Sequence, residues 1–369
     1  MDNQKKYNQF QATMAITKAS LSSIFRSPSA VVFSLLFPLI FIVVFGFIGG
    51  GGISVDVGLD KKSDTANAII QTLKGENSGV RLNTTDSEED MMTNLKKGSL
   101  DAIINVQPIA DKTGKYKVMV QLSSASPKNG QVFNSMLQGL VNRINFSDNN
   151  IPDLKVQMDR PQIIEGRAYK SIDFILPGQL GFSLLASGVF GTAFVFLSLR
   201  QTLVLKRFFA TPIKRSGIVI GEAISRTLFA LAGSVVIILI GKFAFGFTLI
   251  NGIVTFINML VLCTLGLIIF MGFGFVVSGL AKNESSVPPL ANLITMPQFL
   301  LSGTFFSISN FPGWLQPVCK VLPLTYLNDA LRKVAFEGQN LWEVHTQIFI
   351  ILAWGIGVYA LAIKVFKWE

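Results

Sequence analysis

Long stretches without charge dominate the pattern of hydrophobic and polar positions in this chain. Lys, Arg, Asp and Glu are missing from six runs: residues 27–55, 174–199, 227–241, 243–281, 285–319 and 344–363. One charged side chain at the centre of a membrane span costs about 2.5–3.5 kcal/mol, and a span needs about 20 apolar residues. The runs therefore predict six spans, near residues 29–49, 175–199, 222–246, 253–279, 287–307 and 346–364.

The polar segment between the first two runs, residues 53–173, follows a different pattern. Short apolar or alternating runs predict strands at Val55–Leu59, Val80–Leu82, Ala102–Val106 and Tyr116–Leu122, and helical periodicity predicts helices at 63–73, 87–97 and 130–144. The expected fold class is an α-helical polytopic membrane protein with six transmembrane helices, one plus five. An α/β domain is inserted after the first helix.

Composition supports a membrane protein, because 50% of the residues are hydrophobic and only 15% are charged. The formal net charge of +10 is unevenly placed. Residues 53–173 hold 15 Lys and Arg against 15 Asp and Glu, which leaves 17 (32 − 15) against 7 (22 − 15) elsewhere. A nucleic-acid-binding domain would concentrate positive charge, whereas this polar segment is neutral. We therefore expect no nucleic acid partner and interpret the basic excess as a topology signal.

The positions of Lys and Arg predict the orientation of the spans. Twelve of them, within 5–26, 200–215, 282 and 364–367, lie on one side of a six-span chain, and the opposite short loops hold three. By the positive-inside rule both termini are cytoplasmic and residues 53–173 are extracytoplasmic. The first predicted span follows 28 residues and is long for the apolar core of a signal peptide, so we expect it to be retained. The predicted location is the bacterial cytoplasmic (inner) membrane.

The chain contains few of the side chains and motifs that catalysis uses. Cys263 and Cys319 have no neighbours in metal-ligand spacing, and His345 is the one histidine in the sequence. The phosphate-binding pattern G-x-x-x-x-G-K-[ST] does not occur. We expect no catalytic residue, resident cofactor or metal, so any nucleotide energy must come from another chain.

Two segments at the predicted cytoplasmic side have amphipathic character. Residues 200–217 combine basic side chains with two adjacent Phe and a Thr-Pro turn, which predicts a short interfacial helix. It is either a loop that only fixes topology or a helix that receives force from a cytoplasmic partner. Residues 1–28 predict an elbow helix, for which membrane anchoring is favoured over a second partner contact.

Three motifs together resemble the permease subunits of type-2 (exporter) ATP-binding-cassette (ABC) transporters. They are KRFFATPIKRSGIVIGE at 206–222, Leu176-Pro177-Gly178 at the start of the second span, and LSGTFFSISNFPGWLQPVCKVLPLTYLNDALRKVAFEG at 301–338. The resemblance covers nearly the whole chain. Two departures are Arg200-Gln201-Thr202, where the family often has an acidic residue, and Ser307, where it often has Pro.

The resemblance implies a transport subunit that is not itself an enzyme. It would work as a dimer with a second permease copy or paralogue, and with two copies of a separate ATPase subunit that binds ATP and Mg. A periplasmic adaptor is a further candidate partner. By residue-wise carry-over, the ATPase contact would consist of Lys206, Arg207, Phe208, Phe209, Thr211 and Pro212.

The second and fifth spans hold the residues that we expect along the substrate path. They are Phe182, Ser183, Ser187, Phe190, Phe194, Met296, Phe299, Gly303 and Phe305. The alternative for each large apolar side chain among them is a lipid-facing or core position. Such an apolar wall suits a hydrophobic or amphipathic cargo: a drug-like molecule, a lipid or an envelope component.

Prolines and glycine over 303–340 predict a broken re-entrant segment. Ser183, Ser187 and Gly191 predict a close helix contact, as at a dimer face. Glu222 and Arg226 are expected to pair structurally.

The proposed domains are 1–28 (elbow), 29–49 (first span), 53–173 (α/β domain) and 174–369 (five-helix domain). Other function classes fit less well. A receptor or anchoring protein would bind a ligand or envelope partner through residues 53–173, but it would need a cytoplasmic output module. A secondary transporter or channel would place ionisable groups at mid-membrane, and an intramembrane enzyme would need a catalytic cluster.

Overall fold

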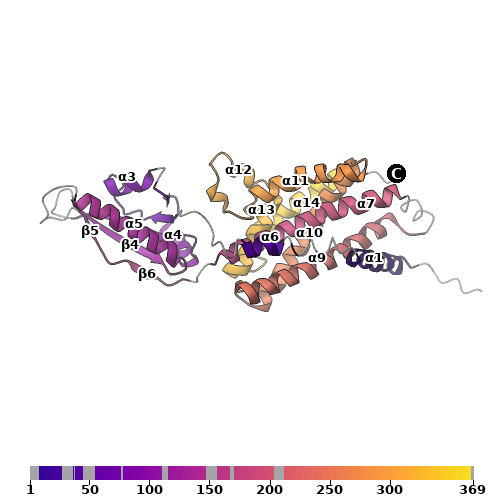
Figure 1. The fold of residues 1–369 in the computed structure, drawn as a ribbon, viewed down its shortest axis with the longest axis horizontal. Helices are drawn as coiled ribbons and strands as arrows, with labels where there is room; N and C mark the ends of the chain where they lie inside the picture. Colours follow the sequence, from indigo (N-terminus) through magenta and orange to yellow (C-terminus); the bar gives the residue numbers. More distant parts are fainter. Residues whose placement is uncertain are drawn as a thin grey trace, which may run out of the picture. The chain divides into compact units, whose positions relative to one another are not determined.

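A computed structural model describes residues 8–26, 36, 38–44, 55–75, 78–109, 115–146, 156–166, 170–202 and 212–366. The chain divides into two compact units (Figure 1). The helical unit comprises Met1–Gly50 and Ser171–Glu369, and the α/β unit comprises Gly51–Lys170. Each unit has a hydrophobic core of its own.

The helical unit is built from long helices joined by short turns. A π-helical turn, η1 (Ser187–Gly191), joins two helices into one continuous rod, and a second one, η4 (Lys333–Glu337), follows α13. The helices are α1 (Gln9–Phe25), α6 (Ser171–Ala186), α7 (Thr192–Gln201), α9 (Arg215–Phe245), α10 (Ile253–Leu280), α11 (Val287–Leu301), α12 (Gln316–Cys319), α13 (Pro323–Arg332) and α14 (His345–Val365).

Four helical stretches in the described part of the chain are long and apolar enough to cross a membrane. They are Ser171–Gln201, Ser216–Phe245, Ile253–Leu280 and His345–Val365. The expected fifth span is α11, whose 15 residues rise only about 22 Å against a hydrocarbon core of about 30 Å. Of the expected first span, 29–49, only residues 36 and 38–44 are described, and they are helical.

Glycines let α10 pack closely against its neighbours inside the helical unit. A Cβ added to Gly274 would lie 2.7 Å from the carbonyl oxygens of Gly188 and Val189 in η1. Gly272 lies against Val358 and Tyr359 of α14 in the same way. Because a side chain at either glycine would separate these backbones, the small residues set how tightly the bundle closes.

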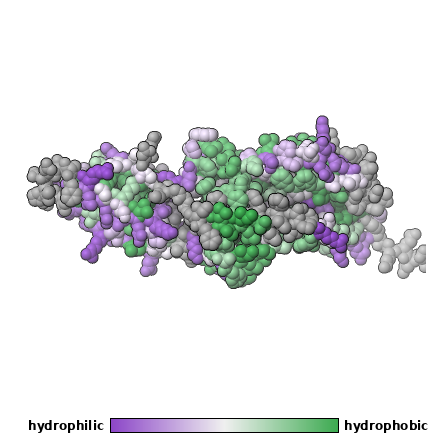
Figure 2. All heavy atoms as spheres, in the orientation of Figure 1, coloured by the Kyte–Doolittle hydropathy of each residue, from purple (hydrophilic) through white to green (hydrophobic). Residues whose placement is uncertain are grey.

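The face of the helical unit that Figure 2 presents is largely apolar, as its green colour shows. Several large apolar side chains on three of the long helices are strongly exposed, including Phe243 at 79%, Ile356 at 75% and Ile363 at 80%. Contiguous apolar surface of this kind on long helices is suited to a lipid environment. The mostly helical unit is therefore a membrane-embedded one.

The α/β unit contains a mixed six-stranded sheet. Its strands are β1 (Val55–Leu59), β2 (Val80–Asn83), β3 (Ala102–Pro108), β4 (Tyr116–Ser123), β5 (Val156–Met158) and β6 (Gln162–Ile164), in the order β2-β1-β3-β4-β5, with β6 also pairing with β4. The β3–β4 pair is antiparallel and the other pairs are parallel. Its helices are α3 (Ala68–Lys74), α4 (Glu88–Lys97) and α5 (Pro127–Phe146).

All four predicted strands and three predicted helices of this unit are present, with one clear difference. The helix expected at 63–73 begins only at Ala68. Its first residues instead bond to β3, since Val106 N donates to Ser63 Oγ and Asp64 N donates to Val106 O. Asn67 then caps α3 by accepting from Ile70 N. The three-residue strands β5 and β6 were not predicted, because so short a run has no readable period.

Candidate functional site

Four phenylalanines from three separate segments form an aromatic cluster in the helical unit. Phe182 of α6 packs against Phe299 of α11 with ring centroids 4.1 Å apart and ring planes tilted by 44°. Phe299 meets Phe305 edge-on at 4.9 Å, and Phe41 lies 5.2 Å from Phe305 and 6.1 Å from Phe299. Rings at these separations attract one another beyond simple burial. We call Phe41, Phe182, Phe299 and Phe305 the aromatic cluster.

A left-handed turn at Gly303 brings Phe305 to this cluster. The φ angle of Gly303 is 71°, a conformation that favours glycine, and it lies two residues after the end of α11. Asn328 of α13 donates to Ser302 O at 3.2 Å and so holds the turn from behind. The chain therefore reverses after α11, and Phe305 is turned toward Phe299.

The structure brings together only part of the predicted substrate path. Phe182, Phe299 and Phe305 form the cluster, and Gly303 is buried beside it. Phe190, Ser183 and Ser187 are partly buried, while Phe194 and Met296 are 37% and 49% exposed. Phe41 was missed, because nothing in its apolar run distinguishes it from the other phenylalanines there.

Two glycines of α6 seat this helix against the turn and α13. A Cβ at Gly178 would lie 3.0 Å from the carbonyl carbon and from Cα of Thr304, and nearer still to the Thr304 oxygen. A Cβ at Gly181 would meet Leu324 and the side chain of Asn328. The Leu176-Pro177-Gly178 motif thus has a packing role, since Gly178 allows the backbone of the turn to approach.

Arg332, at the end of α13, joins the start of α6 to the same turn. Its Nε and Nη2 donate to Phe174 O at 3.1 and 3.0 Å, and Nη2 also donates to Gly303 O at 2.5 Å. The guanidinium carbon lies 3.6 Å from the centroid of the Phe174 ring. Charge-assisted bonds and cation–π contact are strongest away from water, so Arg332 fixes the turn relative to α6.

Gln179 of α6 is a polar residue that the sequence analysis did not single out. Its side chain is 0% exposed, and neither amide atom has a hydrogen-bond partner in the described structure. It precedes Phe182 of the aromatic cluster by three residues, about one helical turn. An unpaired buried amide is costly and needs a partner such as water or a bound polar group.

The predicted ATPase-contact residues Lys206, Arg207, Phe208, Phe209 and Thr211 lie outside the described residues. Pro212 is described, and its carbonyl accepts from Gln9 Nε2 of α1 at 2.7 Å. The same side chain accepts from Lys214 N through Oε1 at 3.2 Å. The start of α1 therefore holds the segment that leads into α9.

Helix α1 packs along the first turns of α9 rather than lying free. Thr17 Oγ1 donates to Gly221 O at 3.1 Å, and Ser20 Oγ donates to Glu222 Oε2 at 2.7 Å. A Cβ at Gly221 would lie 2.9 Å from Ile16, so the glycine permits this approach. The predicted elbow helix is thus tied to the third predicted span by both packing and polar contacts.

Arg226 of α9 contacts the rod formed by α6, η1 and α7. The residue is 7% exposed, and its guanidinium fills the space where a side chain of Gly191 would be, with Cζ 3.3 Å from the Cβ position. Gly191 therefore faces Arg226 of the same chain rather than standing free for a second copy. The carboxylate of Glu222 interacts electrostatically with Arg226, so the two charges partly compensate inside the bundle.

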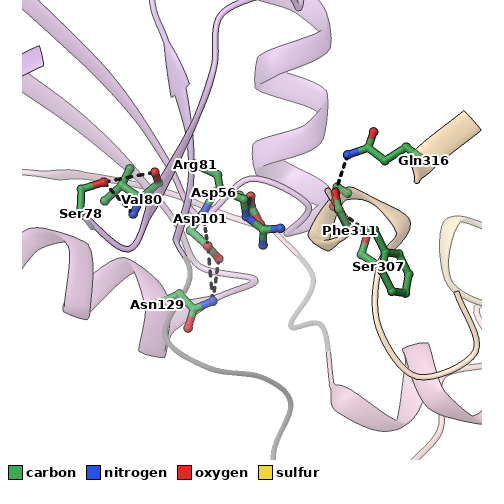
Figure 3. Close-up of polar contacts among 10 residues, drawn as sticks. Asp56, Ser78, Val80, Arg81, Asp101, Asn129, Ser307, Phe311 and Gln316 are labelled. Atoms are coloured by element: carbon green, nitrogen blue, oxygen red, sulfur yellow. Dashed lines mark hydrogen bonds and ion pairs between the residues drawn. The ribbon is translucent and has the colours of Figure 1, made fainter. Parts of the chain in front are cut away.

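The α/β unit contains a separate charged cluster of Asp56, Arg81 and Asp101 (Figure 3). Arg81 Nε lies 3.0 Å from Asp56 Oδ1, while Asp101 accepts from Asp56 N at 2.8 Å and from Ser126 Oγ. Burial raises the pKa of both carboxyl groups above the ordinary value, and Arg81 opposes this rise. Among the described residues, no three His, Cys, Asp or Glu side chains form a group that could hold a metal ion.

The comparison with protein families identifies the chain. Residues 28–364 match the model of the ABC-2 family transporter proteins. The chain belongs to the ABC-2 transporter family. The match agrees with the four span-length apolar helices of this ABC-2 protein.

Individual relatives of this ABC-2 protein agree with that assignment. It is 23% identical over 383 residues to ABC transporter G family member 20 of Dictyostelium discoideum, a match covering 97% of this chain and 51% of that protein. It is 22% identical over 192 residues to the probable multidrug ABC transporter permease YbhR of Escherichia coli K12, covering 51% of each. Nodulation protein J of Rhizobium meliloti is 24% identical over 201 residues, covering 54% of this chain and 74% of that protein. The matches thus span about half the length of the first two relatives.

Proposed function

We propose that this chain is the permease subunit of an ATP-driven exporter that moves a hydrophobic or amphipathic molecule outward or between leaflets. Two copies, or one copy and a paralogue, would face each other across a central path, with a separate ATPase dimer on the cytoplasmic side. The observation that carries this proposal is the aromatic cluster, because it joins α6, α11 and residues 38–44 into one apolar wall.

The proposed topology has six spans, cytoplasmic termini and an extracytoplasmic α/β unit, in the bacterial cytoplasmic membrane. The four span-length helices and the distribution of Lys and Arg support it. Helix α11 would enter the bilayer and end before crossing it. The turn at Gly303 and helix α13 would then lie within the outer half, where Arg332 and Asn328 satisfy backbone carbonyls that lipid could not.

The proposed mechanism runs from residues 200–217 into the bundle. Closure of the ATPase dimer would push on this segment, in which Pro212 and Lys214 are bonded to Gln9 of α1. Because α1 is bonded to α9 at Gly221 and Glu222, the two helices would move as one body. Arg226, seated against Gly191, would pass the motion to the rod of α6, η1 and α7 and so to Phe182.

The proposed cargo has an apolar body and at least one polar group. Phe182, Phe299 and Phe305 offer aromatic surface to the apolar body. Gln179, whose amide atoms lack partners in the described structure, would bond the polar group when the wall opens. Because a lone amide provides neither charge nor several coordinating oxygens, this site does not suit a bare ion.

The test is reconstitution with the ABC ATPase encoded beside this chain. We expect the two to copurify and to hydrolyse ATP, with hydrolysis stimulated by an amphipathic dye. Phe299→Ala should reduce the stimulation, whereas Phe243→Ala, which truncates a phenylalanine that is 79% exposed on α9, should not. Failure to copurify and to hydrolyse ATP would refute the function, and equal loss in both variants would refute the path.

Cysteine labelling from outside the cell tests the topology independently. Both native cysteines are buried, so we expect them to contribute little labelling of their own. A cysteine replacing Lys62 of the α/β unit, whose side chain is 68% exposed, should react with an impermeant maleimide. A cysteine replacing Lys206 should not react until the membrane is permeabilised. Equal reaction at both sites in intact cells contradicts the proposed orientation.

A further inference from the structure

The helical unit contains an apolar groove away from the aromatic cluster. Its volume is about 610 Å³, and it lies where α10, α11 and α14 meet. Its walls include Phe273 and Val276 of α10, Ile294 of α11, and Trp354, Gly357 and Leu361 of α14. A volume of this size is within the range of about 300–1,000 Å³ that ligand pockets occupy.

The packing of α10 against α14 creates this groove. The two helices run in the same direction, since Gly355 lies against Ile269, Gly272 against Val358, and Gly279 against the backbone of Val365. Gly357, two residues beyond the close contact at Gly355, faces open space, and a Cβ there would meet nothing within 4 Å. The tight glycine contacts bring the helices together, and the missing side chain at Gly357 leaves the hollow between them.

Trp354, one turn before Gly357 on α14, forms a fixed wall of the groove. Its indole Nε1 donates to Val321 O at 2.9 Å, and its ring lies 6.1 Å from the ring of Phe273. The indole is therefore anchored by its polar atom and presents its apolar body to the groove. The floor is formed by Val276 and Val358, which are 6% and 4% exposed.

On α14 the groove walls extend from Ile350 to Leu361, and basic residues lie beyond them toward the C-terminal ends of α10 and α14. Lys364 comes three residues after Leu361 and seven after Gly357, which places it on the groove-lining face of α14. Lys282 comes two residues after the end of α10. Both are exposed, and within the described ranges neither forms an ion pair with a carboxylate.

We propose that this groove binds an acyl chain of an anionic phospholipid, whose phosphate pairs with Lys364. The apolar walls suit a hydrocarbon chain and offer little to a polar ligand. Apolar walls alone do not select one lipid, because lipid tails are as apolar as the side chains around them. Selection would therefore come from the ammonium group of Lys364, which follows the last α14 wall residue, Leu361, by three positions.

This lipid site is separate from the proposed substrate path. Helix α11 presents Ile294 to the groove and Phe299 to the aromatic cluster. Five residues place these side chains about 140° apart around the helix. Filling the groove should therefore leave the aromatic cluster intact, and the lipid site can fail while the transport function stands.

The test measures lipid retained by the purified full chain after incorporation into nanodiscs of equal parts dioleoyl phosphatidylglycerol and dioleoyl phosphatidylcholine. Native mass spectrometry counts the lipids that stay bound. One lysine near the membrane surface should give about a fivefold preference for the anionic lipid. Lys364→Gln should bring the ratio close to that of the nanodisc. Equal retention of both lipids by the unaltered chain overturns the proposal.

Two phenylalanine substitutions on neighbouring residues locate the binding. Gly357→Phe should fill the groove and abolish retention, while Ile356→Phe, at a residue that is 75% exposed and absent from the groove walls, should leave it unchanged. Unchanged retention in Gly357→Phe shows that the lipid binds elsewhere and rejects the groove.

Fluorescence provides a readout that needs no groove-filling variant. Phosphatidylglycerol with brominated acyl chains should quench Trp354 more than brominated phosphatidylcholine does. Subtracting the signal of Trp354→Phe isolates this residue from the other three tryptophans. Equal quenching by the two lipids contradicts the proposal, as does its absence, which is also the result expected if a second copy of the chain covers the groove.

Discussion

Replacing Gly178 by alanine tests whether the turn after α11 is held by direct backbone packing on α6. The added Cβ would lie 3.0 Å from the carbonyl carbon and Cα of Thr304, whereas ordinary contacts begin at 3.4 Å. The two backbones must therefore separate by at least 0.4 Å (3.4 − 3.0). No side chain can rotate away to relieve this, because the atoms on both sides belong to the main chain.

The expected cost is that of overpacking a filled interior, about 1–3 kcal/mol. In a unit of this size each kcal/mol corresponds to about 2–4 °C in melting temperature. We therefore expect Gly178→Ala to melt roughly 2–12 °C below a Gly→Ala variant that gains the same helix propensity without the clash. The shift of the turn should also move Phe305 away from Phe299, so substrate-stimulated ATP hydrolysis should fall in the assembled transporter.

Gly357→Ala is the matched control for this experiment. Both substitutions replace a helical glycine and gain the same helix propensity, about 1 kcal/mol. A Cβ at Gly357 meets nothing within 4 Å, so only the clash differs. Melting is followed in detergent micelles by thiol-reactive fluorescence at the two buried cysteines. If Gly178→Ala melts at or above the temperature of Gly357→Ala, the packing argument is wrong.

Three further predictions address other contacts. Arg332→Lys should lower the free energy of unfolding by about 3 kcal/mol, because lysine has no planar guanidinium group to bond the carbonyls of both Phe174 and Gly303. A denaturant midpoint equal to that of the unaltered chain would contradict this. Gly221→Leu should push α1 off α9 and reduce the amount of copurified ATPase, whereas Ile220→Leu, at an exposed neighbour, should not. The raised pKa of Asp101 means that protonation favours the folded α/β unit and that this stability is lost as pH rises through the folded pKa. Hydrogen exchange of β1 amides, corrected for intrinsic rates, should therefore slow as the pH is lowered toward the ordinary pKa of an aspartate, and Asp101→Asn should flatten this trend.

Parts of the candidate site could be predicted because they depend on residue type and spacing. Residue type and position in the second and fifth spans predicted Phe182, Phe299 and Phe305 along one path. These rings do meet, and the path itself stays a prediction. The motifs of the resemblance included Leu176-Pro177-Gly178 and, within 301–338, Arg332, without giving a reason for either. The structure supplies one, since Gly178 admits the Thr304 backbone and Arg332 bonds the carbonyls of Phe174 and Gly303.

Other parts depend on contacts between residues far apart in the chain. Phe41 joins Phe305 across more than 260 positions, and Gln9 reaches Pro212 across 203. Arg226 fills the space beside Gly191, which sequence spacing alone assigned to a dimer face. No local pattern encodes such pairs, because each is decided by which faces of two helices come together.

The sequence by itself determined that much of this chain belongs in a membrane and that an α/β unit interrupts it, because uncharged runs and alternating strands are local properties. Only the tertiary structure decided that α11 stops after 15 residues, that α1 packs on α9, and that α10 and α14 leave a groove at Gly357. The physical reason is that the hydrophobicity of a helix decides whether it lies in lipid or in water. Close contacts at glycines and paired polar groups decide which helices pack against it.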